Sequence, residues 1–326
     1  MRQYLATVLG IWIAACIAAY FFSQQYHIPL SLTTAIVPAF LLELAFYTMP
    51  GFEGIRRRFS STGSKLTRAA LLTGSALAPY LLLSLSTHTF NWFALAKLTV
   101  ATGILSLFYT RVRLGLFSDL LFLAAMAAVY LSTFFDQIYV RPMPHADVNA
   151  LGKLMWIRVG LLAVLCIRGL PGVRFSWWPT RRDWRIGAEM FLLFLPVGAA
   201  VAYAIGFAHF RPPHMVWWMF PLVVLGTFAG FLWIVALAEE FFFRAFLQQL
   251  IAKAAHNETL GLIVASVLFG LSHLPALHKF PNWRFATIGF VSGVFYGIAY
   301  IRAQSVRASM VTHALVVTVW RVFFSG

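Results

Sequence analysis

The chain has little charge and almost no cysteine. Only 11% of its 326 residues are charged, whereas average soluble domains carry about 25%. Its two cysteines, Cys16 and Cys166, both lie inside apolar runs. That arrangement offers no disulfide framework and no metal-type cysteine spacing. The shortage of charge excludes a soluble single-domain fold, a disordered chain and a coiled coil.

Long apolar runs take the place of the missing charge. Apolar residues make up 61% of the chain, and the mean hydropathy is +0.80. A membrane-spanning helix needs about 20 apolar residues, and a β-barrel shows short alternating segments instead of continuous runs. The sequence therefore predicts an all-α, polytopic transmembrane helical bundle with nine to eleven spans. The eleven candidate spans cover 4–22, 30–49, 69–86, 92–110, 114–135, 153–170, 187–208, 215–238, 259–277, 285–301 and 308–324.

The net charge of +15 comes from basic residues that gather between spans. Arg56, Arg57 and Arg58 share one connecting segment, and Arg181 and Arg182 share another. Lys and Arg concentrate in cytoplasmic loops of membrane proteins, so the excess reports topology and does not indicate nucleic-acid binding. We expect an integral protein of the plasma (inner) membrane with a cytoplasmic N-terminus and an outside C-terminus.

A segment rich in tryptophan and arginine, residues 175–186, provides the best internal boundary. Such a segment is typical of the headgroup region of a membrane. We therefore expect an N-terminal membrane region of about six spans over 1–186. This region has no motif that indicates its function. A second region follows over 187–326.

Ionisable side chains inside spans are costly and are functional candidates by default. Glu43, Lys97, Arg158 and Glu189 each stand alone in the sequence. We interpret these four as helix-packing contacts or as side chains that reach the membrane surface.

Glu239 and Glu240 form a different pattern, because two adjacent carboxylates precede Arg244 inside an apolar run. On a helix Glu240 and Arg244 lie on one face and can form an i, i+4 ion pair. Glu239 is turned about 100° away and is left unpaired. An unpaired carboxylate in an apolar site can act as a general base. The alternative is a purely structural cluster of charges at the membrane interface.

Two histidines complete a possible site. His273 follows Phe269 by four residues, and His313 lies in the last span. Residues 254–258 form a polar tip between two spans, and Glu239 and His273 each lie 17 residues from position 256. Antiparallel helices would bring these two to one level, about 25 Å from the tip. A carboxylate and a histidine can deprotonate one water, while a second histidine stabilises an oxyanion.

The order Glu239-Glu240-x-x-x-Arg244, Phe269-x-x-x-His273 and His313 resembles the CPBP family of intramembrane proteases, which includes the CaaX prenyl proteases and bacteriocin-processing enzymes. The resemblance covers roughly residues 187–324. It implies a glutamic-type peptide hydrolase in which Glu239 and His273 activate water and His313 stabilises the oxyanion. Glu240, Arg244 and Phe269 would support them. The substrate would be a membrane-associated protein or peptide, cleaved near its C-terminus.

One position departs from the family pattern. Val317 stands where the family commonly has an asparagine, four residues after the last histidine. Loss of one oxyanion donor can cost about 10²–10³ in rate. Arg321, eight residues after His313, is a possible substitute. The run from Thr312 to Arg321 also resembles the branch found beside exosortase-type sorting systems.

Other readings stay open. No cofactor is expected, although two carboxylates and two histidines can ligate zinc in a variant of the same protease. Serine chemistry is weaker, because Ser272 adjoins His273 without a nucleophile elbow. A non-catalytic scaffold or immunity-type protein would keep the fold and lose the activity. A transporter predicts internal repeats and paired charges in the membrane, and the sequence displays neither. The sequence does not predict the oligomeric state.

Overall fold

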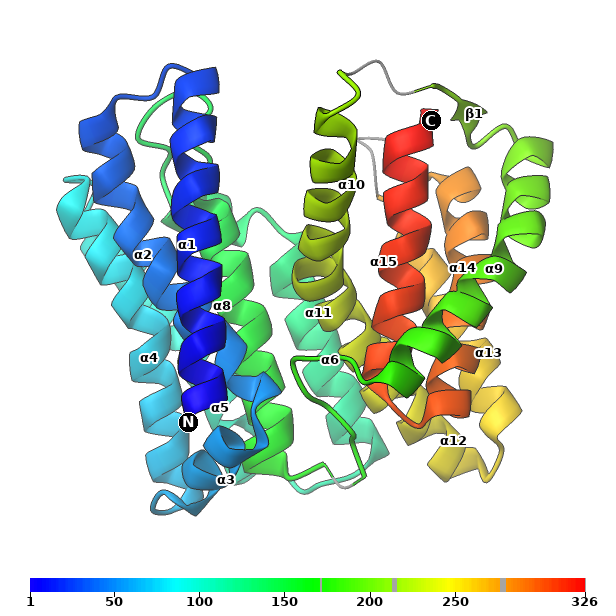
Figure 1. The fold of residues 1–326 in the computed structure, drawn as a ribbon. Coiled ribbons are helices and arrows are strands. Elements are labelled where there is room, and N and C mark those ends of the chain that lie inside the picture. The colour runs from blue at the N-terminus through cyan, green and yellow to red at the C-terminus, as the bar shows by residue number, and fades with distance from the viewer. Residues whose placement is uncertain (171, 213–215, 276–279, 326) are drawn as a thin grey trace. The chain divides into compact units, whose positions relative to one another are not determined.

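A computed structural model describes residues 1–170, 172–212, 216–275 and 280–325 of the chain. The chain divides into two compact units, residues 1–171 and 172–326. Both are built from helices (Figure 1). The all-α bundle expected from the apolar runs is therefore confirmed.

The N-terminal unit is organised around one buried helix. Helix α8 (Asn149–Leu162) continues into a π-helical stretch, η2 (Ala163–Arg168), and most of this span is buried within the unit. Helices α2, α4 and α5 pack around it. The other elements are α1 (Arg2–Gln25), α2 (Leu30–Thr48), η1 (Met49–Gly51), α3 (Glu53–Ser61), α4 (Lys65–Ser86), α5 (Trp92–Arg111), α6 (Leu116–Leu131) and α7 (Phe134–Ile138).

The C-terminal unit is organised around α15, which contacts α9, α10 and α14 (Figure 1). Two short strands, β1 and β2, pair antiparallel. The elements are α9 (Arg181–Ala204), β1 (His209–Phe210), α10 (Met219–Gly230), η3 (Phe231–Ala236), α11 (Leu237–Glu240), η4 (Phe241–Gln248), α12 (Gln249–Ala255), α13 (Glu258–Leu271), α14 (Trp283–Ala303), α15 (Val306–Phe323) and β2 (Phe324–Ser325).

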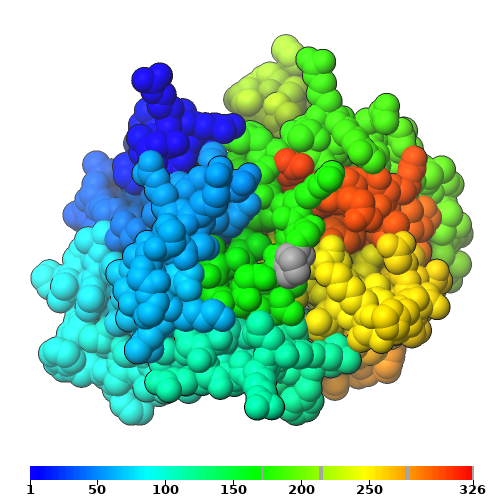
Figure 2. Space-filling model, turned by 90° about the horizontal axis from the view of Figure 1, so that it is seen from below, coloured from blue at the N-terminus to red at the C-terminus, as the bar shows by residue number. Residues whose placement is uncertain are grey.

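The helices reproduce the expected spans in position. Among the described residues, nine helices are long and apolar enough to cross a membrane, and α6 and α13 are shorter apolar helices. The largest difference is the expected span 215–238. It is the first part of one continuous helical segment, Met219–Ala255. The polar tip expected at 254–258 is present: α12 ends at Ala255 and Asn257 caps α13. Figure 2 shows this hairpin in yellow on the surface.

The segment before α9 packs with the C-terminal unit, so the two units divide at 171/172, whereas the sequence predicts a boundary at 186/187. Trp177 stacks on Trp233, with ring centroids 5.9 Å apart. Arg307 of α15 donates a hydrogen bond to the Ser176 hydroxyl at 2.6 Å. These contacts tie the segment to η3 and α15, and the chain order alone does not reveal them.

The four ionisable residues that stand alone in the sequence all have partners in the structure, and these partners lie on other elements. Arg158 pairs with Glu43 at 2.8 Å, and both side chains are buried. Arg302 pairs with Glu189 at 3.0 Å, and Lys97 donates to Gln137.

The pairs of Arg158 with Glu43 and of Arg302 with Glu189 join residues more than 110 positions apart, which explains why the sequence pattern missed them. The Arg158–Glu43 pair extends to Ser75, so it joins α2, α4 and α8.

Glycines let α13 lie close to α14. Gly289, Gly293 and Gly297 recur every four residues along α14, facing α13. A Cβ at Gly297 would come within 2.2 Å of Leu262, and one at Gly270 of α13 within 2.5 Å of the Ala286 carbonyl oxygen. Small residues at this spacing allow close helix approach in membranes. This packing fixes the height of α13, and with it the histidine that follows.

Candidate active site

Glu239 and Glu240 lie between two π-helical stretches of the Met219–Ala255 segment. Stretch η3 ends at Ala236, and η4 begins at Phe241. Such π-helical insertions are rare and occur frequently at functional sites, because they rotate the following side chains relative to a regular helix. The four-residue α11 between them carries both carboxylates.

Glu240 is the centre of a buried charged network. Its Oε2 accepts a hydrogen bond from Nε of Arg244 at 3.0 Å, so the ion pair predicted from the i, i+4 spacing is present. Its Oε1 lies 2.8 Å from Nδ1 of His313. Glu240 and Arg244 are 0% exposed and His313 is 4% exposed. Both carboxylate oxygens are therefore occupied, one by each cation-forming neighbour.

The contact with Glu240 orients the His313 ring. A nitrogen that faces a carboxylate carries a proton, so we infer that Nδ1 of His313 donates to Glu240. The other nitrogen, Nε2, lies 3.9 Å from Oε2 of Glu239. Tyr296 stacks on the ring, with centroids 4.6 Å apart and planes 13° apart. Rotation of the imidazole is thus restricted by a hydrogen bond and by a stacked ring.

Glu239 faces a different direction from Glu240, as the 100° rotation between neighbours predicts. Its side chain is 33% exposed. Its Oε2 is buried and has no hydrogen-bond partner in the described part of the chain. An unpartnered carboxylate oxygen inside a membrane protein is costly and marks a position where a proton or a substrate group can be received.

His273 lies just beyond the end of α13, in the turn before Pro275. The span expected over 259–277 is therefore shorter, because the residue before a proline disfavours the helical conformation. Nδ1 of His273 lies 2.8 Å from the carbonyl oxygen of Phe269. A carbonyl oxygen only accepts, so Nδ1 carries the proton and Nε2 keeps its lone pair. That nitrogen can accept a proton or a hydrogen bond from water.

Phe269 joins the two histidines. Its buried ring lies 4.8 Å from the ring of His273 and 5.9 Å from that of His313, centroid to centroid. The guanidinium of Arg244 lies over the same ring at 5.0 Å. The backbone of Phe269 therefore orients one histidine, while its side chain packs against the other and against the arginine.

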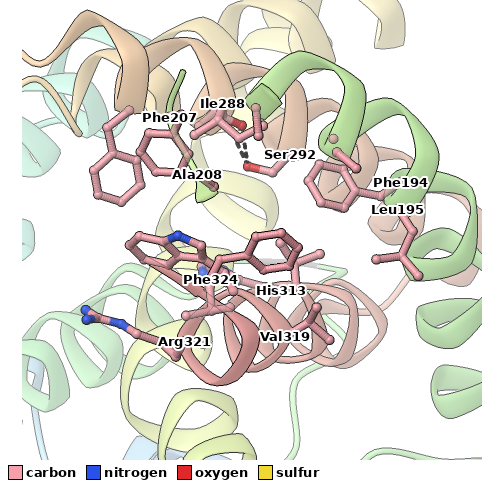
Figure 3. A pocket seen from close by; sticks show the side chains of 18 of the residues that line it. Phe194, Leu195, Phe207, Ala208, Ile288, Ser292, His313, Val319, Arg321 and Phe324 are labelled. Carbon is pink, nitrogen blue, oxygen red and sulfur yellow. Dashed lines mark hydrogen bonds between the residues drawn. The ribbon is translucent and has the colours of Figure 1, made fainter. Parts of the chain in front are cut away.

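Glu239, His273 and His313 line one cavity of about 610 Å³. Figure 3 shows its wall of apolar side chains, to which α9, α14, α15 and the residues before β1 contribute. The labelled apolar residues include Phe194, Phe207, Ile288, Val319 and Phe324. The structure thus brings the three residues predicted from the sequence to the wall of one largely apolar chamber.

Val317 and Arg321 also line this cavity. Val317 offers no hydrogen-bond donor from its side chain. The guanidinium of Arg321 lies over the Trp320 ring at 4.9 Å, and Arg321 is exposed. Figure 3 shows the Arg321 side chain at the edge of the cavity. Its predicted supporting role remains a prediction.

Sequence reasoning missed Tyr296 and Ser292, which lie on the same cavity wall. The contact between His313 and Glu240 was missed as well, because 73 residues separate them. The recurring glycines at 289, 293 and 297 were an available signal: they indicate a helix face in close contact, and Ser292 and Tyr296 each precede one of them by one position.

The residues that could ligate zinc are only partly free for that role. Within the described ranges, no group of three His, Cys, Asp or Glu residues is placed to hold one. The ligand set considered for zinc included Glu240, and both of its oxygens are already occupied by Arg244 and His313. We therefore derive no step through a metal.

The fold and the cavity define a class: an integral membrane protein of helices with a glutamate and two histidines on an apolar chamber. Residues 221–319 match the family model described as Rce1-like, type II CAAX prenyl endopeptidase. This segment is thus similar to the CPBP family, which is a family of proteases. No curated protein and no solved structure matches the chain. The match includes Glu239, His273 and His313 and ends before Arg321.

Proposed function

We propose that the chain is an intramembrane endopeptidase in which Glu239 activates a water molecule. One observation carries the proposal: Glu239 presents a carboxylate oxygen without a protein partner among the described residues, 3.9 Å from Nε2 of His313 and on the cavity that His273 also lines. The similarity of residues 221–319 to a protease family supports it.

The proposed reaction adds one water across a peptide bond. Glu239 takes a proton from water while Nε2 of His273 accepts a hydrogen bond from it. The water oxygen attacks the carbonyl carbon, and the carbonyl oxygen becomes an oxyanion beside His313. Collapse of this intermediate breaks the C–N bond, and the leaving amine receives the proton held by Glu239. The products are a carboxylic acid and an amine, which become a carboxylate and an ammonium group when the second proton of the water is transferred, and no covalent enzyme intermediate forms.

Glu240 and Arg244 act as positioning residues in this scheme. Glu240 holds Nδ1 of His313, and Arg244 neutralises the charge of Glu240 in a buried place. A buried carboxylate is stable only when it is paired and hydrogen-bonded. Together, Glu240 and Arg244 keep Nε2 of His313 directed at Glu239.

The cavity favours a substrate with apolar residues around the cleaved bond. Phenylalanine, valine and alanine are the most frequent apolar side chains in its wall. We propose a membrane-associated protein or peptide, cleaved near its C-terminus as the family description suggests. The distribution of basic residues supports a plasma-membrane protein with its N-terminus in the cytoplasm.

The proposal is tested by comparing protein termini in membranes. Native protein, Glu239→Gln and Glu189→Gln are expressed in cells that lack the native chain, and terminal peptides are identified by mass spectrometry. Glu189→Gln is the matched control, because Glu189 pairs with Arg302 outside the cavity. We expect defined new termini with native protein and Glu189→Gln, and none with Glu239→Gln.

Other outcomes favour the alternatives. Identical termini in all three membranes, with all proteins folded, would favour a non-catalytic scaffold and would refute the proposed role of Glu239. Loss of cleavage on treatment with a chelator, with recovery on addition of zinc, would favour the zinc-dependent protease.

A further inference from the structure

Hydrolysis in this cavity places negative charge on a carbonyl oxygen, and that charge needs hydrogen-bond donors. The backbone N–H groups inside α14 and α15 are already used within the helices. Side chains on the cavity wall can supply such donors. Preorganised donors in an apolar site are worth more than in water, because little solvent competes with them.

Tyr296 is a buried tyrosine on the wall of this cavity. The residue is 2% exposed and lines the cavity together with Glu239 and His313. Its ring stacks flat on His313 and meets Phe269 edge-on at 5.9 Å. Side chains on a helix lean toward the N-terminal turn. Tyr296 therefore leans toward Ser292, which lines the same cavity, and its hydroxyl lies within reach of the Ser292 side chain and near the charges of Glu240 and Glu239.

The other polar side chains near this place are already in use or lie farther out. The hydroxyl of Ser292 donates to the Ile288 carbonyl oxygen at 2.8 Å, as Figure 3 shows. Arg321 is exposed, and its guanidinium covers Trp320. Tyr203 is 83% exposed. Among the described residues that line the cavity, Tyr296 is the buried tyrosine in contact with His313, and its hydroxyl can turn from Ser292 to a substrate oxygen.

We propose that the Tyr296 hydroxyl donates a hydrogen bond to the carbonyl oxygen of the cleaved peptide bond as that oxygen becomes negative. Tyr296 and His313 then form the two sides of one oxyanion site. The O–H bond of Tyr296 is not broken, so the proton balance of the hydrolysis is unchanged. The inference rests on the proposed function and assigns a catalytic residue to it.

The test compares two tyrosines on the same helix. Tyr296→Phe removes the hydroxyl and keeps the ring that stacks on His313. Tyr300→Phe is the matched control: Tyr300 is also buried, lies one turn further along α14, and bonds to Gln249 away from this cavity. Each variant is reconstituted in liposomes. The probe is a quenched fluorescent peptide that spans the cleavage site found by the terminal comparison.

We expect Tyr296→Phe to lower kcat by about 10²-fold with KM changed less than twofold, because the donor acts only in the transition state. Tyr300→Phe should stay within twofold of the native protein. Val317 lies one turn after His313 on the same cavity wall. Adding Val317→Asn to Tyr296→Phe supplies a new donor there and should restore kcat at least tenfold.

The proposal is overturned if Tyr296→Phe keeps kcat within twofold of native. It is also overturned if Tyr296→Phe lowers both the activity and the melting temperature, and if adding Val317→Asn to this variant does not restore kcat. The role of Tyr296 is then structural. A large loss in Arg321→Leu with none in Tyr296→Phe would transfer the role to Arg321. Failure of the proposed function itself is recognised separately, because Glu239→Gln would then cleave as well as the native protein.

Discussion

Replacing Glu240 by glutamine should destabilise the protein, whereas the same change at the neighbouring Glu239 should not. The change leaves Arg244 buried without a charged partner, since both side chains are 0% exposed. Breaking a buried ion pair by removing one partner costs about 3–5 kcal/mol. For a unit of this size, each kcal/mol lowers the melting temperature by roughly 2–4 °C. We expect Glu240→Gln to melt roughly 6–20 °C below the native protein.

The same substitution also disturbs His313. Glutamine offers one acceptor oxygen and one amino group, so it cannot accept from both Arg244 and His313. If the amide nitrogen faces His313, Nδ1 has no acceptor, and the contact that orients the imidazole is lost. A wrong tautomer in a comparable orienting pair costs about 10⁴ in rate. We expect a loss of about 10²–10⁴ in kcat.

Glu239→Gln is the comparison. Glu239 is 33% exposed, and its Oε2 has no hydrogen-bond partner within the described residues and lies 3.9 Å from His313, so no hydrogen-bonded ion pair is broken. We expect this variant to lose activity and to melt within 2 °C of the native protein. Thermal unfolding is followed by tryptophan fluorescence in detergent, because Trp177 and Trp233 are stacked in the C-terminal unit. Equal melting of the two variants, or native activity in Glu240→Gln, would refute the reasoning.

Three further predictions concern packing and metal. Glu43→Gln leaves Arg158 buried without its charged partner and should destabilise the N-terminal unit by about 3–5 kcal/mol. Unfolding is measured by heat-induced labelling of the buried Cys166 in a Cys16→Ser background. The control is Glu53→Gln, which removes an exposed ion pair and should change the stability little. Gly270→Ala brings a Cβ to 2.5 Å from a backbone oxygen and should cost about 1–3 kcal/mol, whereas Gly226→Ala, with nothing within 4 Å, should not destabilise; equal melting would contradict this account of the α13–α14 contact. The chelator phenanthroline should leave the rate of cleavage within twofold of the untreated rate. A loss of cleavage that zinc reverses would show that the reaction needs a metal ion.

The apolar runs determined the fold class by themselves. Burial of about 20 consecutive apolar residues in lipid requires a helix that satisfies its own backbone, so the positions of the helices could be read from composition. Local spacing likewise determined the Glu240–Arg244 pair and the outward direction of Glu239, because both depend only on the rotation per residue of a helix. The polar tip near Asn257 was predicted because a short polar segment separates two apolar runs.

Only the tertiary structure decided which distant side chains meet. The link from Glu240 to His313 spans 73 residues, and the pair of Glu43 with Arg158 spans 115. Tyr296 stacks on His313 because α14 lies between α13 and α15, an arrangement that the glycines of α14 permit. Sequence periodicity describes one helix at a time. The contacts that orient the candidate site form between helices, and their geometry depends on how closely those helices approach.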